Sequence, residues 1–283
     1  MNTVLLLCAL AAADAPVRVV KDIPYLTSAH YADNKDTLDI YVPEGKAGAR
    51  VPVIVWYYGG ALTQGDKSDA TEAGAGKRFA SAGIVTAVVN YRLSPGVSHP
   101  AHIEDAAASF AWVKRHIAEY GGDPNQIFVV GHSAGAYLLA LLALDGRYLA
   151  KHGMSPRDIR GMAPISAFYW VERTGVAPDR PKFVWGTDEK AWIDASPAHH
   201  LRADAPPTLI VYADGDEPWR RQQSVEMAQA LKTAGSGRVE IVQISGRTHM
   251  SILRKLPEDG DPAAARVVEF VRAVSGVPSG VRH

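Results

Sequence analysis

The sequence predicts an α/β protein whose central sheet is mostly parallel and carries helices on both faces. From about Leu38 onward, short apolar runs alternate with stretches of helical periodicity, which is typical of βαβ units. Most of these runs are continuously apolar, as expected of parallel strands buried on both faces. The length of 283 residues fits one domain, which we expect to occupy residues 16–283.

The expected elements follow one another along the chain. The run 38–42 alternates apolar and polar residues, so we expect a half-buried strand at an edge of the sheet. Further strands are expected at 53–56, 84–89, 127–130, 208–211 and 239–244. Helical spacing and good helix formers predict helices at 106–120, 134–144, 221–234 and 263–274.

Residues 145–205 form an irregular excursion with five prolines and, from Phe168 onward, six aromatic rings. A loop-rich segment of this length inside a compact domain is usually functional. We interpret it as a small lid whose aromatics in part line the substrate pocket. The alternative is that the rings only pack the excursion onto the sheet. The aromatics are Phe168, Tyr169, Trp170, Phe183, Trp185 and Trp192.

The charge balance is neutral. Thirty basic and thirty acidic side chains leave no formal net charge. Attraction to nucleic acid or to an anionic membrane surface therefore has no support. We expect a neutral or small molecule as the binding partner.

The first residues carry an apolar run from Val4 to Ala13, which has the length of a signal-peptide core and is too short to span a bilayer. We predict a signal peptide over residues 1–15 and an exported, periplasmic or secreted protein. No Lys or Arg precedes the run, so the alternatives are a short start that packs on the domain or a mis-annotated first residue, and then a cytoplasmic protein. The single cysteine, Cys8, lies in this run and cannot form an internal disulfide.

A nucleophile is predicted at Ser133, within the pattern Gly131-His132-Ser133-Ala134-Gly135. A buried strand runs directly into a helix here, which is the context that a G-x-S-x-G nucleophile elbow requires. The flanking glycines allow the chain to turn sharply, and the helix N-terminus favours a developing oxyanion. The alternative is that Ser133 is only a helix N-cap.

Four further motifs accompany the elbow: Tyr58-Gly59-Gly60-Ala61, Gly65-Asp66-Lys67, Asn90-Tyr91-Arg92-Leu93 and Gly121-Gly122-Asp123-Pro124. With these motifs the chain resembles the esterase and lipase branch of the α/β-hydrolase fold. Within that branch it is most similar to the feruloyl-esterase-like carboxylesterases, near the hormone-sensitive-lipase and kynurenine-formamidase-like families. The resemblance implies a Ser-His-Asp triad, an acyl-enzyme intermediate and no cofactor.

The resemblance also implies an oxyanion hole built from backbone N–H groups. The family has His-Gly-Gly-Gly-Trp where this chain has Tyr58 to Leu62. We expect Gly60, Ala61 and Ala134 to be the donors, with Gly59 allowing close approach. A backbone donor survives the change from Gly to Ala if φ stays negative.

The acid and the base follow from chain order, because in this fold the acid follows a late strand and the base lies near the C-terminus. The loop after strand 208–211 resembles the family's H-G-x-x-D-x-x-P loop, and this resemblance implies Asp216 as the acid. Asp214 is a competitor, which we interpret as a turn former whose side chain bonds its own backbone. His249 follows the last strand and is the predicted base. Asp216 would hold the tautomer of His249 and stabilise the imidazolium.

Other polar residues are interpreted as structural. His132 should point away from the reaction and pack, while Arg92 and Asp105 should form a buried support pair. His99 and His102 have a spacing that could bind a metal, but no carboxylate or cysteine cluster completes a site, so no metal is expected.

The sequence therefore predicts a serine carboxylesterase that acts on small esters with short or aromatic acyl groups. An amidase or formamidase of the same fold is the first alternative. A non-catalytic binding module on this fold is the second, and it typically lacks one of the three predicted residues. We expect no cofactor, no nucleic-acid partner and no membrane span.

Overall fold

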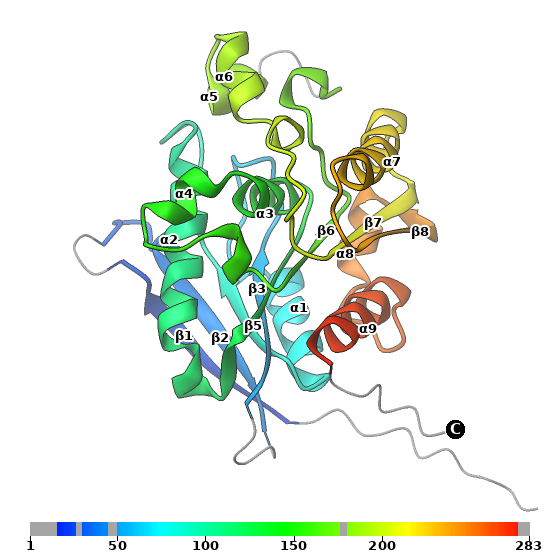
Figure 1. Ribbon diagram of the computed structural model, residues 1–283. Coiled ribbons are helices and arrows are strands. Elements are labelled where there is room, and N and C mark those ends of the chain that lie inside the picture. The colour runs from blue at the N-terminus through cyan, green and yellow to red at the C-terminus, as the bar shows by residue number, and fades with distance from the viewer. Residues whose placement is uncertain (1–15, 27–29, 45–49, 176–179, 277–283) are drawn as a thin grey trace, which may run out of the picture.

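The computed structural model describes residues 16–26, 30–44, 50–175 and 180–276 (Figure 1). The predicted signal peptide lies outside the described residues. None of the described helices has the length and apolar composition needed to cross a bilayer.

An eight-stranded sheet forms the centre of the molecule, in the order β1-β2-β4-β3-β5-β6-β7-β8. β2 pairs antiparallel with β1 and β4, and the remaining neighbours are parallel. The predicted class is confirmed. The strands are β1 (Val17–Pro24), β2 (Thr37–Pro43), β3 (Val51–Tyr57), β4 (Val85–Val89), β5 (Gly122–His132), β6 (Gly161–Ile165), β7 (Thr208–Gly215) and β8 (Val239–Thr248).

The expectation that residues 38–42 form a half-buried edge strand is wrong. β2 is almost wholly buried, because β1 covers its outer side. The polar residue in its alternating pattern, Asp39, accepts a hydrogen bond from Lys67 Nζ at 2.6 Å and is itself buried. The apolar and polar residues of β2 therefore alternate because Asp39 forms a buried ion pair, and not because one face of the strand meets solvent.

Helices cover both faces of the sheet (Figure 1). One buried cluster joins the sheet to α2 (Ala101–His116), α3 (Ala134–Leu144) and α7 (Pro218–Thr233). A second cluster joins the other face to α1 (Ala70–Ser81), α8 (His249–Arg254) and α9 (Pro262–Ser275). The carboxyl ends of β3, β5, β7 and β8 lead into the segments that form the candidate site.

The excursion is only partly a lid. It contains β6, a central strand of five residues that was not predicted from the sequence and that includes Pro164. It also contains α4 (Gly146–Ala150), α5 (Arg180–Trp185) and α6 (Glu189–Asp194). In Figure 1, α5 and α6 form a small projection at the top of the molecule.

The aromatic rings of the excursion mostly face the core. Phe168 stacks on Tyr137 of α3 with ring centroids 4.6 Å apart, and Trp185 Nε1 donates to Tyr137 Oη at 3.0 Å. Phe168, Tyr169 and Trp185 are buried, whereas Phe183 is exposed. Phe168 and Trp185 thus pack the excursion onto α3, as the alternative interpretation expects.

Candidate active site

Ser133 lies at a sharp turn between β5 and α3. Its φ of 55° and ψ of −115° lie in a region that non-glycine residues rarely adopt. A Cβ on Gly135 would lie 2.1 Å from the Tyr57 carbonyl oxygen, and one on Gly131 would lie 2.4 Å from the same atom. Both glycines are therefore required by close approach of β3, and the turn projects the serine hydroxyl beyond the sheet.

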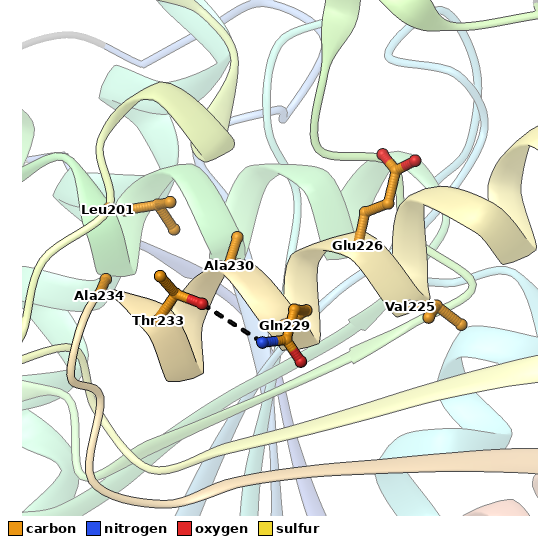
Figure 2. Close-up of a pocket in the computed structure, with 7 residues that line it drawn as sticks. All are labelled: Leu201, Val225, Glu226, Gln229, Ala230, Thr233 and Ala234. Carbon is orange, nitrogen blue, oxygen red and sulfur yellow. Dashed lines mark hydrogen bonds between the residues drawn. The ribbon is translucent and has the colours of Figure 1, made fainter.

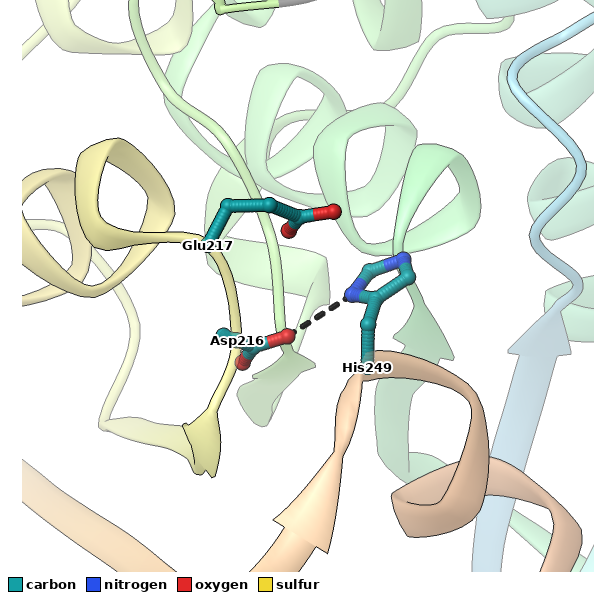
Figure 3. Close-up of side chains that lie close together, drawn as sticks. All are labelled: Asp216, Glu217 and His249. Carbon is teal, nitrogen blue, oxygen red and sulfur yellow. Dashed lines mark hydrogen bonds and ion pairs between the residues drawn. The ribbon is translucent and has the colours of Figure 1, made fainter.

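Ser133, His249 and Asp216 form one hydrogen-bonded chain. Ser133 Oγ lies 2.9 Å from His249 Nε2, and His249 Nδ1 lies 2.8 Å from Asp216 Oδ1. With its proton on Nδ1, the ring donates to Asp216 and accepts from the serine hydroxyl. Figure 3 shows the Asp216 carboxylate pointing at this ring.

The second oxygen of Asp216 is also held. It accepts from Ser166 Oγ at 2.6 Å and from the Ala213 N–H at 2.9 Å. Burial by itself raises the pKa of Asp216, but the hydrogen bonds from His249, Ser166 and Ala213 outweigh it, so the pKa is lowered. This carboxyl is kept ionised.

Ser166 was missed by sequence analysis. It follows β6 with a φ of 50°, it is fully buried, and its N–H donates to the Val211 carbonyl. Its carbonyl accepts from Arg220 Nη1 at 2.9 Å. No local motif marked it, because the excursion concealed β6 and with it the strand end that carries this hydroxyl.

Asp214 lies elsewhere. Its two carboxylate oxygens accept from the backbone N–H groups of Gly246 and Arg247, at 2.9 and 3.1 Å. The side chain therefore connects the end of β7 to the end of β8, directly before His249. The interpretation of Asp214 as a turn former is corrected, because its carboxylate binds the backbone of the neighbouring strand.

His132 packs against the base, as predicted, but it lines the same cavity as Ser133 and does not point away from the reaction. Its ring centroid lies 4.7 Å from that of His249, and its Nε2 lies 2.8 Å from the His249 carbonyl oxygen. Burial, followed by the neighbouring charge of His249, lowers the pKa of His132 to about 3. A neutral imidazole thus supports the base from below.

The glycine loop after β3 differs from the expectation at one point. Gly59 and Gly60 line the same cavity as Ser133, but Ala61 and Ala134 are not among its lining residues. Ala61 has a φ of 60° and Leu62 a φ of 62°, so the condition of negative φ fails. A Cβ on Gly60 would lie 2.0 Å from the Gln64 carbonyl, so the turn bends too tightly for any side chain there.

Residues of the sequence motifs that accompany the elbow pack behind this loop. Tyr58 stacks on Tyr91 with centroids 4.4 Å apart, and Tyr91 Oη donates to the Tyr58 carbonyl at 2.8 Å. Lys67 donates its N–H to Asn90 Oδ1 at 2.8 Å. Arg92 and Asp105 form the predicted support pair, with Nε and Nη2 donating to the two carboxylate oxygens at 2.8 and 2.7 Å.

The cavity beside Ser133 has a volume of about 410 Å³. Its walls come from the glycine loop, from the start of α1 and from His249 with the following helix α8. None of the described residues that line this cavity belongs to 145–205, and the expectation that lid aromatics line the substrate pocket stays a prediction. A buried carboxyl, Glu72, lies in the wall instead.

Metal-ligating groups come together at one place among the described residues. One ligand atom each of Asp216, Glu217 and His249 lie within 4.8 Å of one another (Figure 3). His249 already binds Asp216 through Nδ1 and Ser133 through Nε2. His99 and His102 are the other pair whose spacing could bind a metal. His102 Nε2 lies 3.1 Å from Ser94 Oγ. Burial lowers the pKa of both histidines to about 4.

A second depression, of about 630 Å³, runs along α7 (Figure 2). Its lining is mostly apolar, and its one carboxylate, Glu226, is occupied by Arg173 and Gln222. The lining residues include no histidine, cysteine or serine. This depression therefore lacks the groups for nucleophilic catalysis.

Comparisons with known proteins show similarity to esterases. The BD-FAE family model matches residues 38–156. Esterase LipQ of Mycobacterium tuberculosis is 30% identical over 92% of this chain and 64% of its own length. The probable isoprenylcysteine alpha-carbonyl methylesterase ICMEL1 of Arabidopsis thaliana is 37% identical over 84% of the chain and 53% of its own length. The chain thus spans between about half and two thirds of these relatives.

Solved structures share the fold along nearly the whole chain. A truncated carbohydrate esterase from gut microbiota superposes with a TM-score of 0.79 at 20% identity, covering 94% of this chain and 99% of that one. A thermophilic esterase from Thermogutta terrifontis gives a TM-score of 0.71 at 26% identity, covering 95% and 96%.

Proposed function

We propose that this chain, which belongs to the α/β-hydrolase-fold esterases, is a serine carboxylesterase that uses Ser133 as nucleophile, His249 as base and Asp216 as acid. The observation that carries the proposal is the continuous chain of hydrogen bonds from Ser133 through His249 to Asp216, built on a strained elbow. That arrangement is defined by geometry and roles rather than by sequence position.

The reaction proceeds in two balanced halves. Ser133 Oγ attacks the ester carbonyl carbon while its proton passes to His249 Nε2, and His249 then gives this proton to the departing alcohol oxygen. The acyl-enzyme remains. Water attacks the same carbon and gives a proton to His249, which returns it to Ser133 Oγ as the carboxylic acid leaves.

Charge that develops on the carbonyl oxygen is met by backbone N–H groups. Gly60 and Ala61 of the loop after β3 and Ala134 at the start of α3 are the proposed donors. Ala61 stays in this set because its positive φ strains the chain but does not remove its N–H. The Ala134 N–H belongs to the first turn of α3, where the helix dipole adds to the stabilisation. Gly59 allows close approach, since a Cβ there would lie 3.2 Å from the Ser133 Cβ.

The substrates proposed are small esters with short or aromatic acyl groups. A cavity of about 410 Å³ that is walled in part by Asp69, Glu72 and Arg254 is small and partly polar. Long apolar chains would need a larger apolar surface.

The test is to compare wild type with Ser133→Ala on p-nitrophenyl esters of increasing chain length. We expect the variant to fold and to lose nearly all turnover, because the covalent step disappears. Ser81→Ala, a partly buried serine of α1 outside the cavity, is the matched control and should keep its activity. Retained turnover in purified Ser133→Ala would refute the proposal, and stronger activity on N-formyl amides would identify an amidase.

A further inference from the structure

Glu72 is a buried carboxyl in the wall of the catalytic cavity that the proposed reaction does not use. It lies in the first turn of α1 and is 6% exposed. The same cavity is lined by Ser133 and His249. A carboxyl that is buried this far is normally paired with a cation or fully hydrogen-bonded.

Only half of this carboxyl is satisfied. Oε2 accepts from Trp56 Nε1 at 2.6 Å, and this is the one hydrogen bond that the Glu72 side chain makes to the described residues. Some side-chain atoms of the described residues have neither solvent contact nor a hydrogen-bond partner, and Glu72 Oε1 is not one of them. Because it has no partner, it must be reached by solvent, and the cavity is the space that Glu72 borders.

The charges around Glu72 do not compensate it. Asp69, at the start of the same helix, adds a second negative charge to the cavity wall. Tyr58 and Tyr91 face it as neutral buried phenols. Arg254 of α8 and His249 line the same cavity, but neither lies within ion-pair distance of Glu72 among the described residues. Burial raises the pKa of Glu72 to about 7. The hydrogen bond from Trp56 lowers this pKa, and the negative charge of Asp69 raises it further.

We propose that Glu72 is a specificity-determining residue whose free oxygen accepts a hydrogen bond from the substrate. This inference rests on the proposed esterase function and adds a substrate class to it. The preferred substrates are esters that carry a hydroxyl or an ammonium group on the part of the molecule that enters this cavity. Such a donor completes the hydrogen bonding of a carboxyl that an apolar ester would leave half-satisfied.

The experiment measures kcat/KM on pairs of esters that have nearly the same shape and differ in one donor. Protonated dimethylaminoethyl acetate is compared with isoamyl acetate, and hydroxyethyl acetate with propyl acetate. Ethyl hydroxypropionate and ethyl butyrate place the donor on the acyl side. The ratio within each pair is measured for wild type and for Glu72→Gln, which keeps an oxygen for Trp56 but loses the charge. Dividing the two ratios removes the intrinsic reactivity of each ester.

We expect the wild-type ratio to exceed the Glu72→Gln ratio by about tenfold or more in at least one pair at pH 8. At this pH, above the pKa of about 7, Glu72 is ionised, and a hydrogen bond to a charged acceptor is strong. The ammonium and hydroxyl pairs distinguish the two donors. Asp69→Asn is the matched control, since it removes one negative charge from the same cavity wall. It should change the ratio by less than threefold or so, since a general effect of charge weakens with distance and exposure.

Equal ratios in wild type and Glu72→Gln for all three pairs would overturn the inference and leave Glu72 as a partner of Trp56 only. An equal loss in Asp69→Asn would overturn it as well. If Glu72→Gln does not fold, the inference is tested by inhibition of the wild-type enzyme with two alcohols. Protonated dimethylaminoethanol must then inhibit more strongly than isoamyl alcohol, and equal inhibition would overturn the inference. Hydrolysis of p-nitrophenyl acetate, which carries no donor, reports separately on the proposed function.

Discussion

Two carboxylates two positions apart, Asp214 and Asp216, have different surroundings and therefore different expected roles. Asp216 is 3% exposed, and its oxygens are shared between His249, Ser166 and a backbone N–H. Asp214 binds two backbone N–H groups at the end of the neighbouring strand β8. Only Asp216 can hold the imidazole tautomer.

We therefore predict that Asp216→Asn lowers kcat by about 10³-fold or more, because an amide presents the wrong hydrogen-bonding group to His249. Asp214→Asn should lower kcat by less than about tenfold, since it loses one of two backbone contacts and leaves the triad unchanged. Steady-state kinetics on p-nitrophenyl acetate measures both. If Asp214→Asn were the more damaging variant, the acid would be Asp214.

At the scale of elements, the loop between β3 and α1 turns tightly at residues that are not glycine. Ala61 and Leu62 both have positive φ, a conformation that costs an L-residue about 1–2 kcal/mol. The buried Leu62 holds the loop in place, and its carbonyl accepts from the Ser94 N–H at 2.8 Å. Tertiary contacts thus impose a conformation that the local sequence disfavours.

We predict that Ala61→Gly leaves the free energy of unfolding unchanged or raises it by up to about 1 kcal/mol. Relief of the positive φ outweighs the greater freedom that glycine gives the unfolded chain. Ala73→Gly, in the interior of α1, is the control and should cost about 1 kcal/mol. Urea unfolding measures both variants, and an equal loss in the two would show that Ala61 is not strained.

At the scale of the whole molecule, stability depends on groups buried on both faces of the sheet. Burial lowers the pKa of His99, His102 and His132, so these residues favour folding above the ordinary histidine range and lose that contribution as the pH falls. Glu72 acts in the opposite direction. Its pKa is raised, so the folded state binds its proton more tightly than the unfolded chain does.

The stability of wild type relative to Glu72→Gln should therefore fall as the pH rises from about 4.5 to 7, the window between the ordinary and the folded pKa of Glu72. We predict a relative loss of about 1–3 kcal/mol across this window. The histidines cancel because both proteins contain them. Urea unfolding at pH 4.5, 6 and 8 measures the difference, and a constant difference would contradict the burial of an ionisable Glu72.

Agreement between sequence and structure is closest where local and tertiary preferences coincide. The helix expected at 134–144 has those bounds in the structure, because it combines strong helix formers with an elbow motif at its start. α1 was not predicted, since its sequence contains Gly74 and Gly76. It forms because Gly76 lets the helix approach the ring of Tyr41, which a Cβ would meet at 2.6 Å.

Sequence alone determined the mostly parallel sheet, the elbow at Ser133 and the chain order in which Asp216 and His249 follow it. These features are local patterns or consequences of strand order, and both can be read along the chain. Tertiary structure alone decided that Ser166 supports Asp216, that Glu72 borders the cavity, and that the buried lid rings pack on α3. Each of these depends on which distant residues meet, because burial and hydrogen bonding are set by neighbours in space that no local pattern specifies.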